Sequence, residues 1–175
     1  MPPPPDSMLA ALQASGPSPE IPKADRIYDW LIGSWRARAV DHLSDGSSIE
    51  TQGEWHFGWV LEGRAIQDVW ICPARAQRDL HTPKLRNRYG TSLRVFHPSK
   101  NHWEVTWINP VSGAYDHLVA RREEGRIVQE GTDADGNPMR WVFTDICETS
   151  ARWYGERSMD GGKTWVLEAE FFLER

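Results

Sequence analysis

The feature that most constrains the fold is a regular series of turn signals from residue 35 onward. Segments such as SDGSS at 44–48, DADGNP at 133–138 and MDGGKT at 159–164 supply Gly, Asn and Pro where hairpin turns need unusual or fixed dihedral angles. Between the turns lie short runs rich in β-branched and aromatic residues. Because these runs recur at roughly 8–12-residue spacing with no helical pattern between them, they predict an antiparallel meander closed as a barrel or sandwich.

The expected strands lie at 35–42, 49–57, 64–72, 89–97, 102–109, 114–122, 126–132, 138–146, 151–158 and 164–173. Within them the side chains alternate between an apolar face and a polar face. In the last strand, for example, the residues expected to point inward are Trp165, Leu167, Ala169, Phe171 and Leu173. Glu168, Glu170 and Glu174 alternate with them and are expected to point outward. One apolar, Trp-rich face and one polar face are typical of a barrel wall.

The N-terminal part has a different composition. Residues 1–24 are rich in Pro, Ser and Ala, and we expect a disordered tail with a weak helical turn at 8–13. Residues 25–32 have the spacing of a short amphipathic helix that ends at Gly33. The sequence therefore predicts a tail followed by a single domain at 25–175.

Composition narrows the function classes. The chain has ten Trp against five Phe and four Tyr, which predicts a wide aromatic core, an aromatic-lined cavity, or both. A net charge of −5 argues against nucleic-acid and anionic-membrane partners. No basic and apolar leader is present, so with Cys72 and Cys147 as lone thiols we expect a reduced, cytoplasmic protein.

The six histidines show no metal-ligand spacing, so neither a metal nor a cofactor is expected. The segment 73–88 contains five Lys or Arg residues and no strand pattern. A connection this long is either a solvated basic loop or a lid that offers guanidinium groups to an acidic ligand or a partner chain. Arg88 and Tyr89 lie on its side of the barrel.

Two polar residues are candidates for chemistry. Asp68 lies in GRAIQDVWIC, where it shares a strand face with Arg64. A buried carboxylate must be paired or protonated, so Asp68 is either the partner of a neighbouring arginine or a general base or ligand anchor. His117 is either a structural residue or, if it faces the cavity, a proton shuttle.

The stretch LIGSW at 31–35, a short turn followed by Gly-x-Trp and a first strand, resembles the start of calycin proteins such as lipocalins and fatty-acid-binding proteins. The resemblance implies that Trp35 plugs the closed end of a barrel and that a basic residue, Arg175 or Arg157, covers its indole in a cation–π contact. It places the open mouth at the opposite end, beneath 73–88.

Two further segments, WVLEGR at 59–64 and SMDGGKTW at 158–165, complete a pattern that resembles a lipocalin-like family of bacterial proteins. The second segment also matches the sialidase Asp-box, but one copy in a chain of this length is too little for a propeller, which leaves a hairpin held by Asp160. Nitrobindin-type haem barrels share the Gly-x-Trp start. Their haem histidine lies near the C-terminus, whereas the last histidine here is His117, which puts haem in doubt.

The sequence thus predicts an all-β, single antiparallel lipocalin-like (calycin) barrel of about ten strands with a short N-terminal capping helix. The expected function is binding of a small apolar or aromatic molecule in a Trp-lined cavity. The expected ligand-binding residues are Arg64, Arg88, Tyr89, Trp103, Trp107, Trp141 and Trp153. The alternatives are a cofactor-independent isomerase or cyclase that uses Asp68 and His117 for proton transfer, and a structural or interaction protein. A homodimer is left open.

Overall fold

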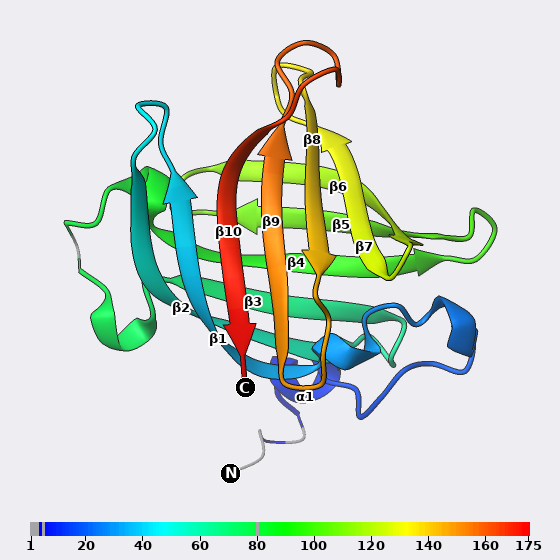
Figure 1. Ribbon diagram of the computed structural model, residues 1–175. Coiled ribbons are helices and arrows are strands. Elements are labelled where there is room, and N and C mark those ends of the chain that lie inside the picture. The colour runs from blue at the N-terminus through cyan, green and yellow to red at the C-terminus, as the bar shows by residue number, and fades with distance from the viewer. Residues whose placement is uncertain (1–3, 5, 80) are drawn as a thin grey trace.

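A computed structural model describes residues 4, 6–79 and 81–175 of the chain. These residues form ten strands that close into one antiparallel barrel, in which each strand pairs with the next and β1 pairs with β10 (Figure 1). The strands are β1 (Gly33–His42), β2 (Ser48–Val60), β3 (Ala65–Cys72), β4 (Arg88–His97), β5 (His102–Asn109), β6 (Ala114–Glu123), β7 (Arg126–Thr132), β8 (Pro138–Thr144), β9 (Ser150–Arg157) and β10 (Val166–Glu174). The predicted fold class and the ten predicted strands are confirmed.

The antiparallel order gives the barrel two different ends. The turns after β1, β3, β5, β7 and β9 gather at one end, which we call the mouth. The C-terminus, the start of β1 and the remaining turns lie at the other end, the closed end (Figure 1). The single helix among the described residues, α1 (Met8–Leu12), also lies at the closed end, where the backbone N–H of Leu61 donates to Leu12.

The helix expected at 25–32 is absent, and the chain forms two 3₁₀ turns instead, Lys23–Asp25 and Asp29–Leu31. Helices this short are marginal by themselves, so tertiary burial decides the local conformation. Here Ile27, Tyr28 and Leu31 are all buried against the barrel interior. The segment still caps the closed end, but as irregular turns.

Trp35 closes this end of the barrel, and Arg175, rather than Arg157, covers it. The Trp35 indole N–H donates to the carbonyl of Leu31 at 2.7 Å. The Arg175 guanidinium carbon lies 4.1 Å from the centre of the indole ring. Its nitrogens also donate to the carbonyls of Ile32 at 2.9 Å and Trp30 at 2.7 Å, which ties the C-terminus to the turn before β1.

The tail was expected at 1–24, disordered apart from a helical turn at 8–13. Residues 1–3 and 5 lie outside the described residues, α1 lies at the expected turn, and the segment after it contacts the closed end. The backbone N–H of Ala14 donates to Trp59 at 2.9 Å, and that of Ser18 donates to Gly63 at 2.9 Å. Ile21 is 3% exposed. Because the segment is rich in Pro, its composition did not indicate that Ile21 would be buried. No helix in the described part of the chain is long and apolar enough to cross a membrane.

Candidate functional site

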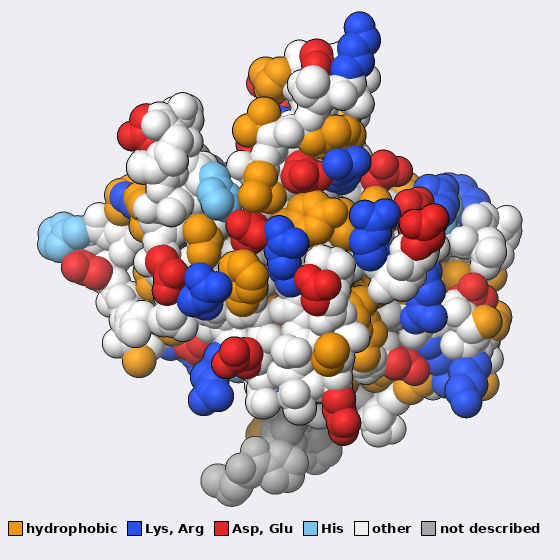
Figure 2. Space-filling model, viewed as in Figure 1, with side chains coloured by type: hydrophobic (Ala, Val, Ile, Leu, Met, Phe, Trp, Pro, Cys, Tyr) orange, Lys and Arg blue, Asp and Glu red, His pale blue; other side chains and the backbone are white. Residues whose placement is uncertain are grey.

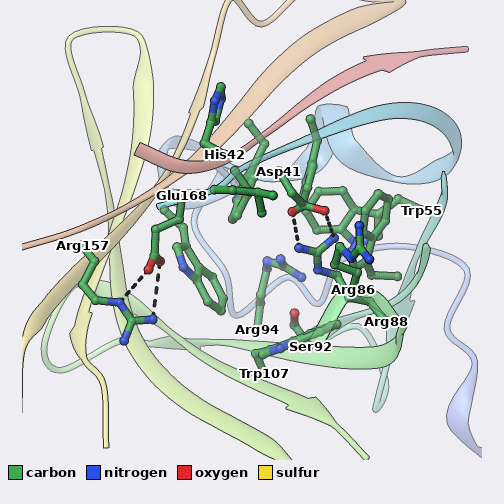
Figure 3. A pocket seen from close by; sticks show the side chains of 17 residues that line it. Asp41, His42, Trp55, Arg86, Arg88, Ser92, Arg94, Trp107, Arg157 and Glu168 are labelled. Carbon is green, nitrogen blue, oxygen red and sulfur yellow. Dashed lines mark hydrogen bonds and ion pairs between the residues drawn. The ribbon is translucent and has the colours of Figure 1, made fainter. Parts of the chain in front are cut away.

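A cavity of about 590 Å³ opens at the mouth, at the end of the barrel opposite Trp35 (Figure 3). Its rim comes from the end of β1, the end of β9 and the start of β10, and its interior comes from inward-facing positions on β2, β3, β4, β5 and β8. The lining residues are Asp41, His42, Leu43, Trp55, Trp70, Arg86, Arg88, Ser92, Arg94, Trp107, Trp141, Trp153, Gly155, Arg157, Glu168, Ala169 and Phe171.

Five tryptophans and one phenylalanine form the aromatic wall of the cavity: Trp55, Trp70, Trp107, Trp141, Trp153 and Phe171. The rings contact one another. Trp153 and Phe171 are stacked, with centroids 4.3 Å apart and planes 10° apart. Trp70 lies 4.6 Å from Phe171 and 5.0 Å from Trp55. Such contacts restrain the rings, so the wall is formed before any ligand enters.

Inward-facing glycines leave space for these rings. A Cβ on Gly53 would lie 2.6 Å from the Trp70 ring, and one on Gly90 would lie 2.5 Å from the Trp107 ring. Glycine inside a strand often marks such a close approach. Both indoles therefore lie close against the barrel wall, which leaves the cavity open.

The innermost part of the cavity is polar and contains Ser92, Arg94 and Asp68, which we call the polar floor. The Asp68 carboxylate accepts the backbone N–H of Ser92 at 2.9 Å and is ion-paired with Nη1 of Arg94. The side chains of both charged residues are almost fully buried. Ser92 and Arg94 line the cavity, whereas Asp68 lies behind them. The carboxylate thus positions the arginine.

Aromatic rings also hold the Arg94 guanidinium. Its carbon lies 5.3 Å from the centre of the Tyr28 ring and 5.4 Å from that of Phe57. The Tyr28 hydroxyl donates to Gln129 at 2.9 Å. Burial is the largest influence on the Tyr28 hydroxyl and raises its pKa well above the usual range. The polar floor is therefore continuous with the core of the closed end.

Charged pairs surround the mouth. Arg88 contacts both carboxylate oxygens of Asp41, and Arg157 contacts Glu168 (Figure 3). Arg157 also pairs with Asp133. Four arginines and two carboxylates line the cavity, and Asp68 and Asp133 pair with two of these arginines from outside the lining. On the outer face seen in Figure 2, acidic and basic side chains are interspersed. Three of the four cavity arginines are thus paired with a carboxylate.

The segment 73–88 contributes to the mouth only in part. Arg75 pairs with Glu54 on the outside of β2, at 2.7 Å between Nη2 and Oε2. Hydrogen bonds from Arg75 are the largest cause that lowers the Glu54 pKa, to about 2. At the other end of the segment, Arg86 and Arg88 line the cavity. One half of the segment is therefore fixed to the outer wall, and the other half supplies guanidinium groups to the mouth.

Four of the predicted site residues line the cavity: Arg88, Trp107, Trp141 and Trp153. Trp103 faces inward but lies deeper, in the core of the closed end, where its indole N–H donates to the carbonyl of Asp25 at 2.7 Å. Tyr89 points outward, is 41% exposed, and lies under the Arg78 guanidinium.

Arg64 and His117 lie outside the cavity. Arg64 is exposed and pairs with Glu20 and Glu62. It lies in the turn before β3 begins at Ala65, so it does not continue the strand face on which Asp68 lies. The side chain of His117 is 51% exposed on the outer face, 3.6 Å from Glu104. Asp68 does pair with an arginine of the neighbouring strand, but the partner is Arg94. The structure therefore does not bring Asp68 and His117 together at the cavity.

Sequence reasoning missed Trp55, Trp70 and Arg94. The alternation of Trp55, Phe57 and Trp59 in EWHFGW was a usable signal, since all three are buried. The sequence did not reveal Arg94 because the residues on either side of it, Leu93 and Val95, are apolar, as inward-facing residues of a strand usually are. Val95 is in fact 40% exposed. Only the pairing of β4 with β3 determines which face of β4 points inward.

Glu168 was also missed, because β10 is irregular between Leu167 and Ala169. A bulge shifts the alternation by one residue, which turns an apparently outward glutamate to the cavity rim. Among the described residues, no group of three or more His, Cys, Asp or Glu is arranged to hold a metal ion.

No protein-family model matches the chain, and no curated protein matches it. Solved structures do match. Rv2717c from M. tuberculosis has a TM-score of 0.58 at 14% identity, covering 89% of this chain and 98% of that one. The S-type phycobiliprotein lyase CPES from Guillardia theta has a TM-score of 0.57 at 13% identity, covering 87% and 92%. Both share the fold. At these identities the likeness shows the barrel fold and nothing about chemistry.

Proposed function

We propose that the protein binds a small apolar or aromatic molecule inside the barrel. The observation that carries this proposal is the aromatic wall, five tryptophans and Phe171 around an open cavity of about 590 Å³. That volume lies within the roughly 300–1,000 Å³ typical of small-molecule sites. Each Å² of apolar ligand surface removed from water contributes about 25 cal/mol, and the preformed wall limits the ordering cost.

The shape of the wall favours a flat, ring-containing ligand. Indole faces on several strands converge on one space, and aromatic faces prefer offset-stacked or edge-to-face partners. At the mouth, arginines of the cavity pair with carboxylates, and the rim is therefore polar. A bound molecule would place its apolar part inside the barrel, away from this rim. These features favour a carrier or sensor of a compact aromatic or polycyclic compound.

The isomerase or cyclase alternative has no comparable support. Proton transfer needs a base within hydrogen-bond reach of the substrate. Asp68 lies behind Ser92 and Arg94, and both of its oxygens are engaged by them. His117 is on the outer face. We therefore propose binding alone.

The test uses N-phenyl-1-naphthylamine, an uncharged aromatic probe whose emission rises in apolar surroundings. Ala169 lines the cavity and is 8% exposed, so Ala169→Phe fills the cavity from β10. The matched control is Val166→Phe on the same strand, because Val166 is 59% exposed. We expect saturable binding to the unmodified protein, weakened about tenfold by Ala169→Phe, a difference of about 1.4 kcal/mol, and unchanged by Val166→Phe.

Thermal unfolding of both variants checks that the barrel is intact. Absence of saturable binding to the unmodified protein, or equal loss in the two folded variants, would contradict binding inside the barrel.

A further inference from the structure

The polar floor has hydrogen-bonding groups without partners. Ser92 and Arg94 are two positions apart on β4, so both side chains lie on the same face and point inward (Figure 3). Ser92 is 2% exposed and Arg94 is 1% exposed. Among the described residues, Asp68 engages Nη1 of Arg94 and the backbone N–H of Ser92, whereas Nε of Arg94 has no hydrogen-bond partner.

Other donors of the cavity residues are in the same condition. Four buried side-chain nitrogens in the described part of the chain lack a partner, and three of them belong to Trp55, Trp70 and Arg94, all of which line the cavity. An unsatisfied buried donor costs about 1–3 kcal/mol. All three are donors, so the missing partner is an acceptor.

The geometry of the Arg94 guanidinium points to the same conclusion. A guanidinium donates through a planar fork of N–H groups that matches a carboxylate, and Asp68 occupies one part of that fork. Asp68 and the rings of Tyr28 and Phe57 hold the guanidinium in place, so it is preorganised for a second acceptor.

We infer that the ligand is an aromatic or polycyclic carboxylic acid whose carboxylate enters first and binds Arg94 and Ser92 at the polar floor. This inference rests on the proposed function, since it names the class of molecule for the same cavity. Arg94 would donate from its guanidinium, whose Nε has no partner among the described residues, and the Ser92 hydroxyl would donate to the second carboxylate oxygen. The ring system would then lie against the aromatic wall.

The test compares 2-naphthoic acid with 2-naphthamide, which has the same ring system and no charge, by isothermal titration calorimetry at neutral pH. We expect the acid to bind at least about tenfold tighter than the amide, as for a hydrogen-bonded charge. Ser92→Ala leaves the Asp68–Arg94 pair intact and should weaken the acid about tenfold without changing the amide.

Removing Arg94 alone would leave Asp68 unpaired and endanger the fold, so the second variant is Asp68→Asn combined with Arg94→Gln. It should abolish the preference for the acid. Arg86→Gln, at the mouth, is the matched control and should keep most of the preference.

The outcomes are distinguishable. If acid and amide bind equally, or if Arg86→Gln removes the preference while the floor variants keep it, the inference is wrong and the proposed function stands. If neither compound binds and N-phenyl-1-naphthylamine also fails to bind, the proposed function is wrong as well.

Discussion

The two ends of the barrel use the same residue type for different purposes. At the closed end, the indole N–H groups of Trp30, Trp35 and Trp103 each donate to a backbone carbonyl, at 3.0, 2.7 and 2.7 Å. In the cavity, the indole N–H groups of Trp55 and Trp70 have no acceptor in the described part of the chain. Tryptophans that complete the fold are satisfied by the protein, whereas tryptophans of the cavity wall leave donors free.

Arginine shows the same contrast. Arg175 covers Trp35 and gives its N–H groups to three carbonyls of the chain. Arg94 gives one nitrogen to Asp68 and keeps an unpartnered Nε. Gln129 is the exception at the closed end, because its amide nitrogen lacks a partner. In the described part of the chain, unsatisfied buried donors therefore belong mainly to residues of the cavity rather than to the closed end.

The largest expected effect comes from truncating tryptophans at the two ends. Trp35→Ala removes a fully packed plug and should lower the free energy of unfolding by about 3–5 kcal/mol. Trp107→Ala removes a half-buried ring that already borders empty space, so the loss should be about half as large, with binding of N-phenyl-1-naphthylamine reduced. Urea unfolding measures both. Equal losses would erase the distinction between plug and wall.

The next largest effect on stability is expected from removing the Arg94 guanidinium. Arg94→Met leaves the Asp68 carboxylate buried without a counter-charge and should cost about 3 kcal/mol. Adding Asp68→Asn removes the uncompensated charge and should recover much of this loss. The urea midpoint of the single and double variants checks the expectation. A double variant as unstable as the single one would mean that the packing of Arg94, rather than its charge, determines stability.

A smaller effect is expected from Gly155, which faces the cavity. An added Cβ would lie 2.9 Å from the Trp153 ring and 3.4 Å from the Trp141 ring, and both contacts are with side chains. Gly155→Ala should therefore push Trp153 toward the cavity and weaken N-phenyl-1-naphthylamine about threefold, roughly 0.7 kcal/mol. Gly58→Ala is the control, since nothing lies near its Cβ position. Unchanged affinity in Gly155→Ala would show that the wall rearranges freely.

The smallest effect concerns the turn held by Asp160. The backbone N–H and hydroxyl of Thr164, with the Ser158 hydroxyl, lower the Asp160 pKa to about 2. A lowered folded-state pKa stabilises the fold above the unfolded value near 4, and this contribution is lost as pH falls toward 2. Asp160→Asn should thus be slightly less stable than the unmodified protein at pH 7, with the difference shrinking on acidification. A pH-independent difference in urea midpoint would contradict the assigned role.

Turn chemistry and period-two alternation were sufficient to predict the strands, because Gly, Asn and Pro determine local backbone geometry wherever the chain folds. The same rules placed Trp107, Trp141 and Trp153 inward. Depth along the barrel axis was not accessible, which is why Trp103 was assigned to the cavity rather than to the closed-end core.

The rest of the site depends on interactions between strands. Which face of β4 points inward follows from its register with β3, so Arg94 was unrecognised although its partner Asp68 was singled out. The register shift in β10 between Leu167 and Ala169 places the exposed Glu168 at the cavity rim. The expected helix at 25–32 became 3₁₀ turns because burial of Ile27, Tyr28 and Leu31 outweighed helical periodicity.

The most direct test of the central claim follows the indole N–H resonances of the ten tryptophans in a ¹H–¹⁵N spectrum while 2-naphthoic acid is added. The predicted result is that Trp55, Trp70, Trp107, Trp141 and Trp153 shift, with Trp55 and Trp70 among the most affected, while Trp30, Trp35 and Trp103 stay in place. Shifts confined to the closed-end tryptophans, or no shifts at saturating ligand, would contradict a ligand site in the cavity.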